Sequence, residues 1–160
     1  MSQVTVAIMM GSKSDADIMR EAANMLEEFG VSCEMRVLSA HRTPRECAEY
    51  AENFRKNGGK VFICGAGVSA ALSGVVAAHT TLPVIGVPID ASPLGGMDAL
   101  LSTVQMPPGV PVGAVAIGKS GAKNAALLAV RILSLSDESL VGKLEQFRDN
   151  NKKKILDTKL

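Results

Sequence analysis

The sequence predicts an α/β fold in which helices cover both faces of a parallel sheet of about five strands. Short apolar runs and amphipathic helical stretches alternate five times along the chain. The runs expected to form strands are residues 3–10, 32–38, 61–64, 84–87 and 113–117. Because strands that alternate with helices pair in parallel through right-handed crossovers, this order predicts three layers with the sheet in the middle.

The first run, residues 3–10, is apolar and rich in β-branched residues, and it carries no charge. This composition is typical of a central strand that is buried on both faces. Ile18, Ala22 and Phe29 then recur at helical spacing, and Gly30 provides a C-terminal stop for that helix. Asp15 is a candidate N-cap at its start.

The second helix is predicted from Thr43, a candidate N-cap, and from Pro44, which is favoured in the first turn of a helix. Cys47, Ala51 and Phe54 lie on one face of this helix. Further helices are expected at residues 70–78, 97–104, 123–135 and 137–157. The last of them is amphipathic, so one of its sides should pack against the rest of the chain.

Residues 89–112 are rich in Gly, Pro, Ser and Met and show little periodicity apart from one short helix. So long an irregular segment inside a compact domain is usually functional or forms an interface. We expect its apolar part, residues 94–112, and the last helix to contact other subunits.

Length and composition predict one domain over residues 1–160, with a core over residues 4–135 and a C-terminal helix at 137–157. Seventeen basic and sixteen acidic residues give a net charge of +1, and only 3% of residues are aromatic, which argues against nucleic-acid binding. We expect no membrane segment, because no apolar run is long enough and no signal peptide is visible. Three cysteines without a CxxC pair predict free thiols in the cytoplasm.

Polar or glycine-rich loops follow the predicted strands, whose carboxyl ends should meet at the edge of the sheet where such folds bind ligands. The loop after the first strand offers the hydroxyls of Ser12 and Ser14, the carboxylate of Asp15 and free amides at a helix N-terminus. This setting favours an anion such as phosphate. A polar turn capped by Asp15 would explain the loop equally well.

His41 follows the second strand, beside Arg42, at the same predicted edge. A side chain that titrates near neutral pH is suited there to general acid or base chemistry, and the simpler alternative is a loop histidine held by hydrogen bonds. Arg42 can bind phosphate or carboxylate through two donors. Together with Ser12 and Asp15 it suggests a sugar phosphate, with Asp15 bound to the ribose hydroxyls. His79 is expected to be a helix C-terminal cation or a surface residue.

Two motifs are misleading matches. Residues 113–120 match the P-loop pattern GxxxxGK[ST], but the four middle residues are expected to form a buried strand instead of a phosphate-binding loop. Residues 65–70 match the start of a dinucleotide fingerprint, with Asp90 downstream, but the helix that follows is short. The safer inference is that the amides of residues 65–69 can approach a carboxylate, a phosphate or carbon dioxide.

Six motifs taken together resemble the PurE-type family of purine biosynthesis, which contains N5-carboxyaminoimidazole ribonucleotide mutase and aminoimidazole ribonucleotide carboxylase. They are, in chain order, MGSKSD, SAHRTP, GAG, LPVIGVP, VQMPPGVPVG and KNAALLA, and the resemblance covers residues 4–135. It implies a flavodoxin-like doubly wound fold and a homo-octamer with sites between subunits. It also implies a small-molecule substrate, an aminoimidazole ribonucleotide derivative with carbon dioxide, and no metal or organic cofactor.

The resemblance implies a role for each candidate site residue. Ser12, Asp15 and Arg42 would bind the ribonucleotide. His41 would move the proton at ring carbon C4 when carbon dioxide migrates there from the exocyclic nitrogen. Further candidate substrate-binding residues are Ser14, Ser39, Gly65, Ala66 and Gly67.

The sequence departs from the mutase pattern in one place. Many mutases read GAGGAAHLPGM where this chain has Ala71 in place of the histidine and Ser73 in place of the proline. The ALSG tetrapeptide is similar to the carboxylase class, whereas SAHRTP and VQMPPGVPVG look like the mutase class. We expect a mutase, with direct carboxylation by free carbon dioxide as one alternative and a noncatalytic nucleotide-sensing domain as another. The sequence leaves open whether Lys119 or Lys123 reaches the site.

Overall fold

The computed structural model describes residues 4–159 and contains a parallel sheet of five strands. They are β1 (Val6–Met10), β2 (Cys33–Val37), β3 (Val61–Gly67), β4 (Val84–Ile89) and β5 (Gly113–Ala114). Their spatial order is β2-β1-β3-β4-β5, which is the order of a flavodoxin-like fold and confirms the predicted fold class. The first strand was expected to include residue 3, which lies outside the described residues.

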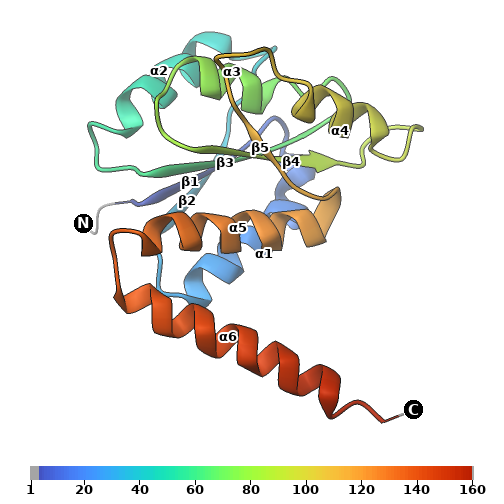
Figure 1. Ribbon diagram of the computed structural model, residues 1–160. Coiled ribbons are helices and arrows are strands. Elements are labelled where there is room, and N and C mark those ends of the chain that lie inside the picture. The colour runs from blue at the N-terminus through green and yellow to red at the C-terminus, as the bar shows by residue number, and fades with distance from the viewer. Residues whose placement is uncertain (1–3, 160) are drawn as a thin grey trace.

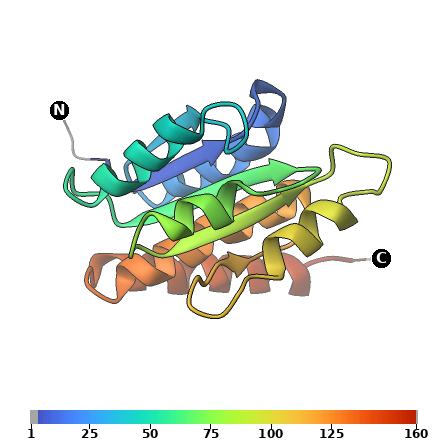
Figure 2. The same cartoon turned by 90° about the horizontal axis from the view of Figure 1, so that it is seen from above.

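The helices form a layer on each face of the sheet. They are α1 (Ala16–Glu28), α2 (Pro44–Phe54), α3 (Leu72–Ala78), α4 (Met97–Val104), α5 (Gly118–Ser134) and α6 (Ser139–Leu156), with a 3₁₀ turn η1 (Lys13–Asp15) before α1. Figure 1 shows α2, α3 and α4 on one face, α1 and α5 on the other, and α6 packed outside α5. Figure 2 shows the helices lying alongside the strands, with their axes roughly aligned. Within residues 4–159 no helix is both long enough and apolar enough to span a membrane.

The side chains of β1 alternate between two hydrophobic clusters, one on each face of the sheet. Val6, Ile8 and Met10 pack in the cluster that includes α1 and α5. Ala7 and Met9 pack in the cluster that includes α2 and α3. All five are at most 1% exposed, which explains why this strand carries no charge and lies near the middle of the sheet.

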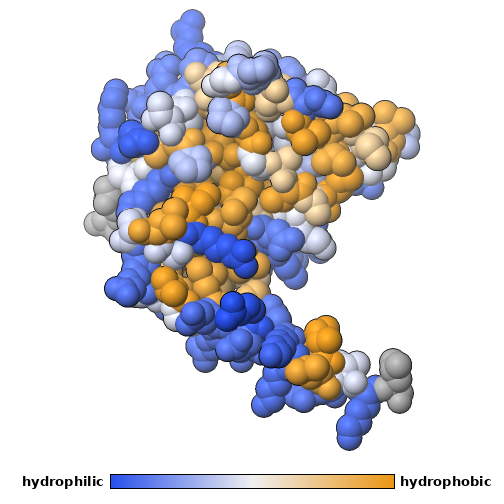
Figure 3. Space-filling model, viewed as in Figure 1, coloured by the Kyte–Doolittle hydropathy of each residue, from blue (hydrophilic) through white to orange (hydrophobic). Residues whose placement is uncertain are grey.

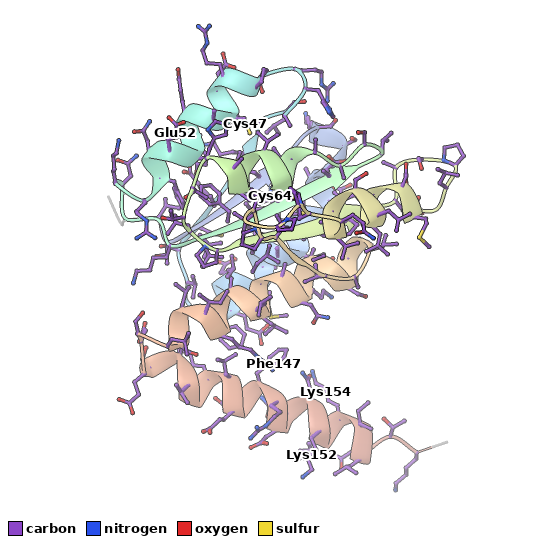
Figure 4. The ribbon with its side chains drawn as sticks, turned by 45° about the horizontal axis from the view of Figure 1, so that its top comes forward. Cys47, Glu52, Cys64, Phe147, Lys152 and Lys154 are labelled. Carbon is purple, nitrogen blue, oxygen red and sulfur yellow. The ribbon has the colours of Figure 1, made fainter. Side chains whose placement is uncertain are left out.

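The first half of α6 packs on the helix layer formed by α1 and α5. Leu140, Leu144 and Phe147, which share one side of α6, join that cluster, and the Phe147 ring lies 5.6 Å from the ring of Phe29 (Figure 4). The second half is exposed and extends away from the rest of the molecule, and the apolar pair at residues 155–156 near its end stands apart from the other apolar surface (Figure 3).

β3 and β4 are longer than the sequence pattern predicts. The pattern ends the third strand at Cys64, but β3 continues to Gly67, which pairs with Ile89 at the end of β4. Residues 65–67 are glycine and alanine, which are typical of a loop and show no apolar pattern of a strand. They pair because β4 lies beside them. β4 likewise continues through Pro88, and α3 begins two residues later than expected.

β5 is shorter than predicted and α5 is longer. The pattern predicts a strand up to Ile117, but only Gly113 and Ala114 pair with β4. The chain then leaves the sheet, and α5 begins at Gly118, which has a positive φ of 75°, instead of at Lys123. The sequence analysis rejected the P-loop match because it expected residues 114–117 to form a buried strand. That expectation is wrong for most of these residues, because only Ala114 belongs to β5 and the others lead into α5.

Neither of the two predicted N-caps makes a capping hydrogen bond. Asp15 directly precedes α1, but its side chain accepts no backbone N–H of that helix. Ser12 instead caps the preceding turn η1. Thr43 precedes α2, and its Oγ1 accepts the backbone N–H of Ser39 (2.8 Å) and donates to the Ser39 carbonyl oxygen (3.1 Å). The Asp15 carboxylate is therefore not used to start its helix.

Candidate functional site

A pocket of about 390 Å³ opens at the carboxyl ends of β1, β2 and β3. The loops that follow these strands line it, together with Ala91 after β4. Its polar lining residues are Ser12, Ser14, Asp15, Ser39, His41, Arg42 and Ser69. The pocket thus lies at the edge of the sheet where a parallel topology is expected to bind a ligand.

The loop after β1 places two hydroxyls next to a carboxylate. The Ser12 Oγ accepts the backbone N–H of Ser14 (3.3 Å) and the Ser14 hydroxyl (2.9 Å). The Ser14 Oγ also lies 3.3 Å from Oδ1 of Asp15. These short contacts hold the three polar side chains together on the wall of the pocket.

Asp15 is a nearly buried acid in this wall, with 6% of its surface exposed. Burial raises the pKa of its carboxyl above the usual value, because water no longer solvates the charged form. Hydrogen bonds from the Ser14 side chain and the Ser12 backbone, and the charge of Arg42, oppose this rise in pKa without cancelling it. A ligand hydroxyl that donates to this carboxylate would replace part of the lost hydration.

Arg42 connects the loop after β2 with the loop after β1. Its Nη2 donates to the carbonyl oxygen of Gly11 (2.9 Å), and its backbone N–H donates to the Oγ of Ser39 (3.2 Å). Ser39 is buried, and Thr43 holds it through the two bonds described above. The guanidinium is therefore fixed beside the serine-rich loop, and its remaining donors can bind an anion in the pocket.

His41 is an exposed residue of the same wall, next to Arg42 in the sequence. Exposure leaves the ring nitrogens accessible to a bound ligand, as an acid or base requires. The structure thus brings His41 and its neighbour Arg42, from the loop after β2, into one pocket with Ser12 and Asp15, which follow β1.

The end of β3 forms the opposite wall. Ala66 and Gly67 line the pocket, but Gly65 does not. Gly65 is buried against α1, where an added Cβ would collide with the side chain of Met19. A direct role of Gly65 in substrate binding stays a prediction, and its observed position favours a packing role.

The two lysines that the sequence left open lie outside the described lining of the pocket. The Nζ atoms of Lys119 and Lys123 lie 3.8 Å and 3.3 Å from the carboxylate of Glu21, so both lysines connect α5 with α1. His79 ends α3, as predicted, and its Nδ1 lies 3.0 Å from Oε1 of Glu52 on α2.

Five apolar side chains line the pocket although the sequence analysis selected none of them: Ala40, Val68, Ala71, Leu72 and Ala91. None carries a functional group, so a search for reactive side chains passes over them. Ala91 could have been found from its place directly after β4, because the carboxyl ends of neighbouring parallel strands share one edge.

The cysteines offer no reactive thiol. All three are free. Cys47 on α2 and Cys64 on β3 lie inside the hydrophobic cluster on the face of the sheet that α2 and α3 cover (Figure 4). Burial raises the pKa of both thiols, which keeps them protonated and unreactive. Within the described part of the chain, no three His, Cys, Asp or Glu side chains gather in a way that could hold a metal ion.

Comparison with known proteins gives consistent matches over almost the whole chain. The chain is 53% identical over 151 residues to N5-carboxyaminoimidazole ribonucleotide mutase of Vibrio parahaemolyticus, which covers 94% of each chain. It is 54% identical over 156 residues to the protein of the same name from Bacillus subtilis, covering 98% of this chain and 96% of the relative. The crystal structure of Treponema denticola PurE superposes with a TM-score of 0.86 at 33% identity, covering 95% of this chain and 94% of that one.

The family model for AIR carboxylase matches residues 5–154, which include every strand and all lining residues of the pocket. The resemblance seen in the sequence motifs is thereby confirmed. The chain belongs to the AIR carboxylase family.

Proposed function

We propose that the protein is an N5-carboxyaminoimidazole ribonucleotide mutase of purine biosynthesis. The observation that carries the proposal is the pocket that joins His41 and Arg42 to Ser12 and Asp15, in a chain more than half identical to relatives of that name. The same similarity does not favour direct carboxylation or a noncatalytic sensor, although Ala71 departs from the mutase pattern.

The polar walls of the pocket suit a ribose phosphate. Arg42 supplies a fixed guanidinium, and Ser12 and Ser14 supply hydroxyls on the same side, which is a suitable donor set for phosphate. Asp15, nearly buried, accepts hydrogen bonds from ribose hydroxyls. The ligand then spans the two loops that Arg42 already connects.

In the proposed reaction His41 transfers one proton and the pocket keeps one molecule of carbon dioxide. The C–N bond of the carbamate breaks, the exocyclic nitrogen gains a proton and carbon dioxide is released. Ring carbon C4 then forms a bond to carbon dioxide, and His41 removes the C4 proton, which restores the aromatic ring. The overall change is an isomerisation, so a single histidine can serve first as acid and then as base. Positioning of both fragments is the main contribution of the protein.

The test is turnover of the carbamate substrate by the purified full chain in buffer freed of bicarbonate. We expect formation of 4-carboxy-5-aminoimidazole ribonucleotide without added bicarbonate. Turnover of aminoimidazole ribonucleotide only when bicarbonate is supplied would instead identify the carboxylase. Tight binding of either ribonucleotide without turnover would identify a nucleotide-sensing domain.

We also propose that eight copies of the chain assemble, with active sites between subunits. Support comes from the apolar surface that Leu94, Met97, Leu101 and Val104 form on α4 and the loop before it, each side chain being at least half exposed. In Figure 3 this surface continues toward the centre of the view. A second copy of the chain, with the same apolar surface, is its proposed occupant.

Light scattering tests this assembly and should give eight times the chain mass of 16.7 kDa. Leu101→Glu should lower the measured mass, because a buried unpaired charge opposes association. No other residue of α4, Asp98 included, is changed in that variant. A monomer of the unaltered chain at micromolar concentration would contradict the proposal.

We propose further that the chain forms a single domain and acts in the cytoplasm. The hydrophobic clusters on the two faces share the strands of one sheet, and α6 joins one of these clusters. Three free thiols suit a reducing compartment. Fractionation of cells that express the tagged chain tests the location, and a single unfolding transition tests the single domain.

A further inference from the structure

The loop after β2, which carries His41 and Arg42, is closed at its base by Thr43. The backbone N–H of Thr43 donates to the carbonyl oxygen of Ser39 (2.9 Å). The Thr43 hydroxyl donates to the same oxygen (3.1 Å), and its Oγ1 accepts the backbone N–H of Ser39 (2.8 Å). One hydroxyl therefore bonds to both backbone groups of Ser39, and residues 39–43 form a closed turn with His41 at its middle.

The Thr43 hydroxyl serves this turn and not the helix that follows it. A threonine directly before a helix commonly accepts a backbone N–H of the first helical turn. Thr43 precedes α2 but makes no such bond, and Pro44, the first residue of the helix, has no N–H to offer. The start of α2 therefore does not explain the hydroxyl, and its two bonds to Ser39 are what it contributes.

The position of the His41 ring depends on the backbone of the turn. Within residues 4–159 the ring makes no hydrogen bond that would hold it. Ala40, the residue before it, packs against the hydrophobic cluster on the face of the sheet that α2 and α3 cover. The imidazole is thus placed by its own backbone, which is held by this packing on one side and by the bonds between Ser39 and Thr43 at the base.

Arg42 depends less on this base, because it has a second anchor. Its backbone N–H and its Nε donate to the Oγ of Ser39 (3.2 Å and 3.4 Å). Its Nη2 donates to the carbonyl oxygen of Gly11, in the loop after β1. That bond does not involve Thr43. Loss of the Thr43 hydroxyl should therefore displace His41 more than the guanidinium.

Removal of the hydroxyl would leave the backbone N–H of Ser39 without its partner. Ser39 is buried, so water does not readily replace the lost bond, and a buried donor without an acceptor is costly. The base of the turn is then expected to shift until this N–H finds another acceptor. His41 follows two residues later, and a shift of about 1 Å at a reacting group can cost about 10²-fold in rate.

We propose that Thr43 is a positioning residue that holds the His41 imidazole where it can remove the C4 proton. This inference rests on the proposed mutase function. Thr43 lies outside the lining of the pocket and acts only through the turn. In the step it supports, the proton passes from C4 to a ring nitrogen of His41, and the electron pair of the C–H bond returns to the aromatic ring.

The first test compares Thr43→Val with Thr43→Ser. Valine keeps the branched shape but lacks the hydroxyl, so kcat per pocket should fall about 10- to 100-fold. The KM for the carbamate should change less, because Arg42 keeps its bond to Gly11. Competent pockets are counted by the stoichiometry of product binding, so misfolded molecules do not enter kcat. Thr43→Ser keeps the hydroxyl and should restore kcat to within about twofold.

The matched control is Thr80→Val, in the loop after α3 and outside the pocket. Thr80 is partly buried, as Thr43 is, and its Oγ1 accepts the backbone N–H of Leu82 (3.2 Å). The variant therefore loses a loop hydrogen bond of the same kind. Urea unfolding should show a lower midpoint for both valine variants, whereas only Thr43→Val should lose turnover per pocket.

The second test identifies the step that Thr43 supports. The substrate is the carbamate with deuterium at C4, and the measured quantity is the ratio of kcat for the light and the heavy substrate. In Thr43→Val this ratio should be clearly above one and at least as large as in the unaltered protein. The reason is that a displaced imidazole slows removal of the C4 proton relative to the other steps.

Each outcome decides the proposal. Unchanged kcat per pocket in Thr43→Val would overturn it, as would a Thr43→Ser variant as slow as Thr43→Val or an equal loss in Thr80→Val. An isotope ratio near one, or below that of the unaltered protein, would place the lost rate in another step and overturn the link to His41. An unaltered protein that does not convert the carbamate would contradict the mutase function itself, and this inference with it.

Discussion

Arg42 Nη2 donates a hydrogen bond of 2.9 Å to the carbonyl oxygen of Gly11, and this bond joins the loops that follow β2 and β1. The two residues are 31 positions apart in the sequence. Because β1 and β2 are parallel neighbours, their loops leave the sheet side by side, and a long planar side chain can span them. The bond orients the guanidinium before any ligand arrives, which lowers the entropic cost of binding an anion.

Arg42→Lys should weaken substrate binding while leaving the fold intact. A lysine keeps the charge but cannot donate to the Gly11 carbonyl and to phosphate through one planar group. We expect KM for the carbamate to rise about tenfold to a hundredfold, the loss of one or two charge-assisted hydrogen bonds, with a smaller change in kcat. Steady-state kinetics measures this, with the exposed neighbour Arg45→Lys as control. Equal effects of both substitutions would refute the assigned role.

His41→Asn should lower kcat about 10² to 10⁴-fold, because asparagine has a similar size but cannot accept and return a proton. His41 is exposed, so the urea midpoint of unfolding should hardly change. The matched control is His79→Asn, which alters the second histidine at the end of α3 and should keep full activity. Full turnover by His41→Asn would exclude the proposed proton transfer.

Asp15→Asn should stabilise the protein at neutral pH and weaken substrate binding. Burial raises the pKa of Asp15 in the folded state above the usual 3.8, so the folded protein binds more protons than the unfolded chain in the window just above that value. Stability therefore falls as pH rises through this window, and the cost of the buried charge is fully present above it. The variant lacks the charge and avoids the cost.

Urea unfolding at several pH values checks this prediction. The gain of Asp15→Asn over the unaltered protein should be present at neutral pH and should vanish below pH 3.8. Asp17→Asn, at an exposed position in the first turn of α1, should show no gain, because its charge is favourable at a helix N-terminus. A gain that persists at low pH would assign the effect to something other than titration of Asp15.

Much of the fold could be predicted from the sequence because side chains determine it. The run that became β1 is apolar on both faces, and Cys47, Ala51 and Phe54 are buried on one face of α2, at the spacing that the sequence shows. The ends of β3 and β5 could not be predicted in this way. Residues 65–67 pair because β4 lies beside them, and the pairing of residues 113–117 stops because the chain turns away toward α5.

The same distinction applies to the site. Ser12, Asp15, His41 and Arg42 are polar residues directly after apolar runs, so their place at the carboxyl edge follows from a parallel sheet alone. Val68, which lines the pocket with a positive φ of 56°, gives no such signal. The sign of its φ depends on how β3 is joined to α3, and an exposed valine in a sequence of mixed composition is not distinctive.

Val68→Gly should raise the free energy of unfolding by about 0.5–1 kcal/mol, because it removes left-handed strain from a β-branched residue and adds only the larger entropy of an unfolded glycine. Val68→Ala keeps a Cβ and should change stability much less. Urea unfolding of both variants measures the difference. A Val68→Gly variant less stable than the unaltered protein would show that the side chain contributes more by packing than its exposure suggests.

Gly67→Ala should destabilise the protein by about 1–3 kcal/mol and lower its activity, because the new methyl group has no room. An added Cβ would lie 2.7 Å from the Cβ of Ala91 and 3.1 Å from the carbonyl oxygen of Ile89, so the end of β3 must move away from β4. That movement shifts the wall of the pocket that carries Val68.

The matched control is Gly142→Ala in α6, where an added Cβ meets nothing within 4 Å. Alanine is favoured over glycine inside a helix, so this variant should be more stable by up to about 1 kcal/mol and should keep full turnover. Unfolding in urea and steady-state kinetics on both variants separate the two effects. If Gly67→Ala kept normal stability and activity, the close approach of β3 and β4 at this point would not be required for the site.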